Sequence, residues 1–199
     1  KYSHVDAIRR YASQLTEERQ FIQAREQLAK GSALYDDAID RRILKPSGDL
    51  GRLYADMGDL DYFFEGRHER ALSNYERAVR DGWAPPEIRY RMGYIHYNRG
   101  QWRTALERFY EASMDMPLNR RLLFSLANTA AQQGNHQIAQ GYYNRLLDVL
   151  ELERSRFPRL VPAGSVEHAE LAERLMRARN NLGVTLEELA RQSGRTDYR

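Results

Sequence analysis

Three kinds of position recur with a period of 34 residues in the middle of the chain. In each copy a glycine is followed five residues later by an alanine, and four residues after that by an aromatic residue. The positions are Gly66, Gly100 and Gly134, then Ala71, Ala105 and Ala139, then Tyr75, Phe109 and Tyr143. A repeat of this length, with a glycine where one helix ends and small and aromatic residues on the next, is typical of stacked helix-turn-helix units. The sequence therefore predicts an array of antiparallel helix pairs.

The best copy runs from Pro86 to Pro117. Its pattern residues are Met92, Gly93, His96, Gly100, Trp102, Ala105, Phe109, Ala112 and Pro117. On these residues the chain resembles the tetratricopeptide repeat (TPR) family over residues 52–153. The resemblance implies an all-α fold, a right-handed superhelical α-solenoid of antiparallel helix pairs. In the preceding copy Asp59 takes the small-residue position and Met57-Gly58 comes one place early, which leaves the register of that first helix open.

The N-terminal flank departs from the repeat. Residues 1–48 are predicted to form a helical pair, either a degenerate repeat or a cap, with helices over 4–30 and 33–44. Gly31 is interpreted as the stop between these helices. Residues 49–153 then form the three TPR-like repeats.

The C-terminal flank, residues 154–199, is predicted to extend the last repeat. A helix from His136 continues to Phe157, and Ser165 caps a second long helix that ends near Ser193. The loop between them is marked by Pro158, Pro162 and Gly164. Because the second helix contains the pattern of a repeat's first helix without its partner, the sequence is interpreted as a fragment of a larger TPR-containing protein.

Composition favours a non-enzymatic protein. No apolar run has the length of a membrane span, and there are no cysteines. The five histidines lack metal-ligand spacing, and no phosphate loop or nucleophile motif occurs, so no cofactor, metal, catalytic residue or small-molecule substrate is expected. The 31 basic and 28 acidic residues are interspersed, so nucleic acid is not expected as a partner. The compartment stays open between cytoplasm and periplasm.

The TPR resemblance places a partner-binding groove on the first helix of each repeat. Carried over by position, the groove residues are Phe63, Phe64, Tyr90, Tyr94, Tyr97, Asn98, Arg121, Phe124, Asn128, Arg177, Asn180 and Asn181. Aromatic and amide side chains of this kind suit recognition of a peptide or helix of another protein.

The predicted function is therefore a scaffold that binds a partner protein in this groove. Two alternatives stay open: a structural component of a large, cell-envelope or periplasmic assembly that uses the flanking helices, and, third, a nucleic-acid binder that uses the arginine excess. Self-association through an exposed groove face also stays open.

Overall fold

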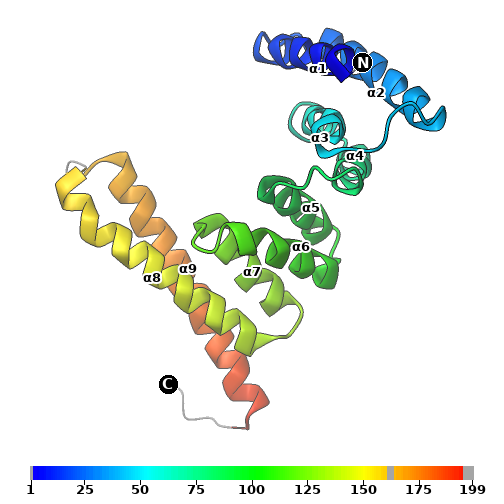
Figure 1. Cartoon of the computed structure of the whole chain (residues 1–199). Coiled ribbons are helices and arrows are strands. Elements are labelled where there is room, and N and C mark those ends of the chain that lie inside the picture. Colours follow the sequence, from blue (N-terminus) through cyan, green and yellow to red (C-terminus); the bar gives the residue numbers. More distant parts are fainter. Residues whose placement is uncertain (1, 161–163, 195–199) are drawn as a thin grey trace. The chain divides into compact units, whose positions relative to one another are not determined.

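The structure, a computed structural model, describes residues 2–160 and 164–194. Within them nine helices and no strands form (Figure 1). The helices are α1 (Tyr2–Glu17), α2 (Phe21–Asp40), α3 (Gly48–Phe63), α4 (His68–Arg80), α5 (Pro86–Asn98), α6 (Trp102–Asp115), α7 (Arg120–Gln132), α8 (His136–Leu160) and α9 (Val166–Gln192). Among these helices we find none with the length and apolarity that a membrane span requires.

The chain divides into two compact units, Lys1–Ile88 and Arg89–Arg199. The division falls inside the first turn of α5, within the segment that the sequence assigns to the three central repeats. The first unit therefore holds α1 to α4, and the second holds most of α5 and all of α6 to α9. The division into 1–48, 49–153 and 154–199 stays a prediction.

The repeated positions are core positions. The three repeat alanines and the three repeat aromatic residues are buried. In the first unit a Cβ at Gly58 would lie 2.5 Å from the ring of Tyr75, and in the second a Cβ at Gly93 would lie 2.7 Å from the ring of Phe109. A glycine on the first helix of each pair thus lets the aromatic residue of the second helix lie directly against the backbone.

The small residue of α3 is Gly58, and not Asp59. Gly58 and Gly93 both stand five residues before the end of their helices, at Phe63 and Asn98. The connection from α3 to α4 is then one residue longer than the connection from α5 to α6. The extra residue of this copy therefore lies in the turn, which resolves the register that the sequence left open.

The N-terminal flank differs from the prediction of a single helix over 4–30. The chain turns at Arg19, whose φ is +60°, and Gln20 N donates to Leu15 O at 2.7 Å. The α5–α6 turn has the same geometry, with Gly100 at φ +69° and Gln101 N donating to His96 O at 3.0 Å. Arginine thus occupies the left-handed position that glycine normally takes, so α1 and α2 form a repeat-like hairpin without its sequence signal.

Gly31 does not end a helix. It lies inside α2, where a Cβ would come within 3.2 Å of Ile8 and of Leu53. The glycine is needed for the close approach of α1 and α3 to α2, and the helix continues past it to Asp40.

Replacing Arg19 with glycine is expected to stabilise the protein by about 1 kcal/mol, because a left-handed backbone costs a non-glycine residue roughly that much. Arg41→Gly is the matched control: φ at Arg41 is −76°, so glycine relieves no strain there and gains no stability. Urea unfolding followed by circular dichroism measures both variants. An equal gain for both would show that strain at the turn is not the cause.

The C-terminal flank agrees with the prediction of two long helices. Ser165 caps α9, with its Oγ accepting from His168 N at 3.4 Å. Pro158 does not begin a loop, because α8 continues to Leu160; Pro162 lies outside the described residues. The two helices run antiparallel, side by side (Figure 1). They pack with α7 around a core of Leu123, Leu146, Leu150, Leu171, Leu175 and Ala178.

Candidate functional site

Helix α7 presents three of the predicted groove residues on one face. Asn119 is the N-cap of α7, because its Oδ1 accepts a hydrogen bond from Leu122 N at 3.1 Å. Arg121, Phe124 and Asn128 then follow at intervals of three and four residues, so their side chains share one face. Arg120 and Arg121 occupy the first turn, where positive charge opposes the helix dipole and no acidic residue offsets it. These arginines therefore add nothing to helix stability through the dipole.

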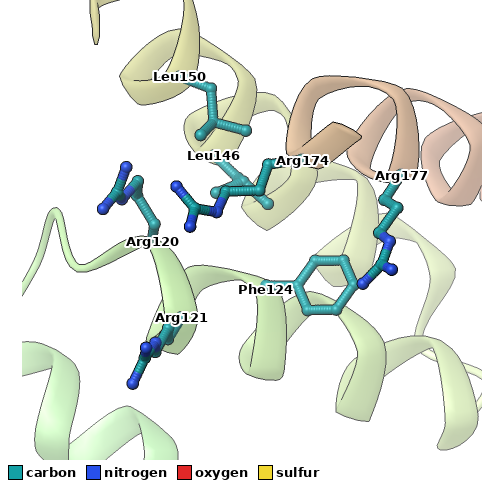
Figure 2. Close-up of a pocket in the computed structure, with 7 residues that line it drawn as sticks. All are labelled: Arg120, Arg121, Phe124, Leu146, Leu150, Arg174 and Arg177. Carbon is teal, nitrogen blue, oxygen red and sulfur yellow. The ribbon is translucent and has the colours of Figure 1, made fainter. Parts of the chain in front are cut away.

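This face of α7 borders a cleft of about 270 Å³ in the second unit. The lining residues are Arg120, Arg121 and Phe124 from α7, Leu146 and Leu150 from α8, and Arg174 and Arg177 from α9. Figure 2 shows Arg174 extending from α9 toward the side of the cleft where Arg120 lies, and the ring of Phe124 directed toward Arg177. The site combines an apolar floor with guanidinium groups supplied by two helices.

The cleft lining carries four positive charges and no carboxylate. Three of the arginines have a glutamate partner outside the lining: Arg120 pairs with Glu153 at 2.5 Å, Arg174 with Glu170 at 2.8 Å, and Arg177 with Glu173 at 2.5 Å. Within the described residues Arg121 is exposed and has no ion pair. Pairs this open to solvent contribute about 0.5 kcal/mol or less each, so an incoming carboxylate can compete for the guanidinium groups.

The side chains of Asn128 and Asn181 form a hydrogen bond with each other, and neither residue lines the cleft. Asn128 Oδ1 accepts a hydrogen bond from the hydroxyl of Tyr143 and another from Asn181 Nδ2 at 3.1 Å. Burial raises the pKa of Tyr143, partly offset by its hydrogen bond with Asn181, so the hydroxyl stays protonated and donates. These bonds connect α7, α8 and α9, which gives asparagine inside a helix a structural reason.

Asn128→Ala is expected to destabilise the second unit by about 1–2 kcal/mol, because it leaves the Tyr143 hydroxyl without its acceptor. Asn180→Ala is the matched control: Asn180 is an exposed asparagine on the same helix as Asn181, and its loss should change stability by less than about 0.5 kcal/mol. Thermal unfolding of both variants distinguishes them. Equal stability of the two would show that the Asn128 hydrogen bonds contribute little.

The tyrosines of α5 divide into two half-buried rings and one exposed ring. Tyr90 and Tyr97 are half-buried against the α6–α7 core, and the Tyr90 hydroxyl lies 3.5 Å from Ser125 Oγ of α7. Tyr94 is 40% exposed and stacks on Tyr97, with ring centroids 6.5 Å apart. Burial raises the pKa of Tyr97, and Tyr94 adds to the rise. Of the three rings, Tyr94 is the one most accessible to a partner; Asn98 is exposed at the end of the same helix.

Phe63 and Phe64 belong to the first unit. Phe63 ends α3 and is exposed, with its ring against Tyr62 at a centroid distance of 4.9 Å. Phe64 follows the helix and stacks on Phe21 of α2 at 4.0 Å. With Gly58 in register with Gly93, the counterparts of Tyr97 and Asn98 are Tyr62 and Phe63, so Phe64 falls outside the face that the repeat pattern defines.

The structure thus brings Arg121, Phe124 and Arg177 together in one cleft. Their neighbours in the cleft, Arg120, Arg174, Leu146 and Leu150, were not predicted from the sequence. The Arg120-Arg121 pair at a predicted helix start and the three-residue spacing of Arg174 and Arg177 were the available signals. The described residues contain no group of three or more His, Asp or Glu side chains placed to hold a metal ion.

No protein-family model matches the chain, and no curated protein matches it in sequence. Solved structures match it in fold. YrrB, described as a TPR protein with an unusual peptide-binding site, aligns with a TM-score of 0.61 at 14% identity, covering 90% of this chain and 89% of YrrB. MamA aligns with a TM-score of 0.59 at 17% identity over 81% of this chain and 79% of MamA. PcrH from Pseudomonas aeruginosa aligns with a TM-score of 0.51 at 15% identity over 72% of this chain and 97% of PcrH.

These alignments show that the chain has the fold of TPR proteins. The fold expected from the 34-residue pattern is confirmed, an all-α solenoid of antiparallel helix pairs. At these identities the likeness carries the fold and no specific partner.

Proposed function

We propose that this protein is a non-enzymatic scaffold that binds a peptide or helix of a partner protein on one face of its second unit. The face, here called the groove face, consists of Tyr94 on α5, Arg121 and Phe124 on α7, and Arg177 on α9. The observation that carries the proposal is the cleft, because it unites predicted groove residues from α7 and α9 around an apolar floor.

The chemistry of the groove face supports protein recognition. An exposed tyrosine offers a large contact area at a low cost in conformational entropy, and arginine and tyrosine are enriched among the residues that dominate binding energy at interfaces. The half-buried Phe124 gives an apolar side chain of a partner a surface to pack on. YrrB, whose fold this chain shares, is described as having a peptide-binding site.

The proposal is tested by affinity capture from a lysate of the source organism with three forms of the protein. The groove variant is Tyr94→Ala with Arg121→Ala. The matched control is Tyr110→Ala with Arg103→Ala, which removes an exposed tyrosine and an exposed arginine from α6. We expect proteins that bind the wild type and the control to be lost from the groove variant. Retention of the same proteins on all three would contradict the proposal and move the interaction to another surface.

A further inference from the structure

Resting on the proposed function, we propose that the cleft between α7, α8 and α9 selects an acidic segment of the partner protein. A carboxylate of that segment pairs with Arg121, and a neighbouring large apolar side chain enters the cleft over Phe124, Leu146 and Leu150. The occupant is thus a protein segment in which an aspartate or glutamate lies beside an apolar anchor.

The charge balance of the cleft favours an acidic ligand. Arg120, Arg174 and Arg177 each have one glutamate, and Arg121 has none among the described residues. The cleft therefore lacks one counter-charge, and a single carboxylate supplies it. Guanidinium binds carboxylate through two parallel hydrogen bonds, which fixes the orientation of the incoming side chain as well as its charge.

The apolar floor of the cleft favours a ligand that also carries a large apolar side chain. Leu146 and Leu150 line the cleft although they are core residues, and Phe124 packs half-buried beside them. An apolar cavity of roughly 150 Å³ can hold a benzene ring, so the 270 Å³ of this cleft has room for a large apolar side chain and part of a carboxylate. A ligand that offers only a charged group would leave the apolar side chains of this floor exposed to water.

The local balance of charge favours a protein segment over a nucleic acid. Glu153, Glu170 and Glu173 surround the cleft arginines, so a chain with a negative charge at every backbone unit would meet three carboxylates as well as the guanidinium groups. A protein segment can place a single carboxylate at Arg121 and present neutral or apolar residues to the rest.

The experiment is a selection from a random-sequence peptide library on the whole chain, in parallel with its Arg121→Gln variant. Arg103→Gln is the control, because it removes an exposed α6 arginine that already has an i,i+4 glutamate partner. Circular dichroism establishes that all forms fold alike. An enriched peptide is then synthesised with each acidic residue changed to its amide and with its apolar residue changed to serine, and affinities are measured by fluorescence anisotropy at low and high salt.

We expect the wild type and the control to enrich peptides with an acidic residue beside a large apolar residue. Arg121→Gln should lower the affinity for the selected peptide about tenfold or more, which is the loss expected for one charged hydrogen-bonded contact. Amide substitution in the peptide should lower the affinity by a similar factor. After Arg121→Gln the acid and amide peptides should bind alike.

Any one of four results would overturn the inference. If the enriched peptides are neutral, or if Arg121→Gln binds them as well as the wild type does, the acid-selective cleft is wrong while the scaffold function stands. Tighter binding of a labelled single-stranded RNA than of any peptide, abolished by Arg121→Gln, would assign the cleft to nucleic acid. If no form enriches any peptide, the proposed function fails together with the inference.

Discussion

Substituting alanine for Gly58 or Gly93 is expected to lower the free energy of unfolding by roughly 2 kcal/mol, a typical cost of overpacking a well-packed core. The added Cβ would lie 2.5 Å from the Tyr75 ring or 2.7 Å from the Phe109 ring, distances that require the ring or the helix to move. Neither ring can yield easily. Both are fully buried, and the Tyr75 hydroxyl donates to Asp59 Oδ1 at 2.8 Å.

The same substitution at open helix positions should have the opposite sign. Gly141 on α8 and Gly183 on α9 would place a Cβ at least 4 Å from the surrounding described atoms. Because alanine is favoured over glycine inside a helix by about 1 kcal/mol, Gly141→Ala and Gly183→Ala should stabilise the protein. Urea unfolding of the four variants measures the contrast. Stabilisation by all four would contradict the close helix packing that the repeat glycines are inferred to permit.

Asp61→Ala is expected to destabilise the first unit by about 3 kcal/mol, the lower range for breaking a buried charged network. Asp61 is 1% exposed, and its two carboxylate oxygens accept from Arg25 Nη2 and from Asn74 Nδ2, each at 2.9 Å. Its removal leaves Asn74 without that partner and part of the Arg25 guanidinium unpaired. Arg25 keeps its contact with Glu65 at 2.6 Å, which is why the effect falls in the lower range.

Asp37→Ala provides the comparison for the Asp61 variant. Asp37 is 53% exposed and pairs with Arg41 one helical turn away, so its loss should cost about 0.5 kcal/mol or less. Chemical unfolding of both variants measures the two losses of stability. Similar costs for the two would mean that the network around Asp61 does not hold α2, α3 and α4 together as the structure implies.

The sequence predicted the parts of the fold that depend on side-chain volume at fixed spacing. Gly93 and Phe109 are in contact because one helix must lack a side chain where the other carries a ring. Such a requirement can be recognised in the sequence from the residue types alone. Turns were harder to predict. Arg19 adopts a conformation that glycine would favour, and Gly31 lies inside a helix because a neighbouring helix needs the space. At Gly31, tertiary packing overrides the local preference.

The candidate site was predictable in part. Repeat spacing placed Arg121 and Phe124 on one face of a helix, and the structure adds that Arg177 of α9 reaches the same cleft. Leu146 and Leu150 could not be assigned to the cleft from the sequence. The spacing of a leucine on a helix predicts that its side chain is buried, but it does not predict that part of the side chain borders a cleft. Asn128 was predicted as a groove residue, but its oxygen is occupied by Tyr143 and Asn181, a contact that depends on the path of α9.

Site-specific photo-crosslinking shows directly whether the groove face contacts a partner protein. A photoreactive phenylalanine derivative replaces Tyr94 on the groove face in one form of the protein and Tyr110 on α6 in the other, both of which are exposed tyrosines. After irradiation in cells of the source organism, we expect a discrete partner protein to be captured from position 94 and to be absent from position 110. Capture of the same partner from both positions, or from position 110 alone, would contradict a partner-binding groove face.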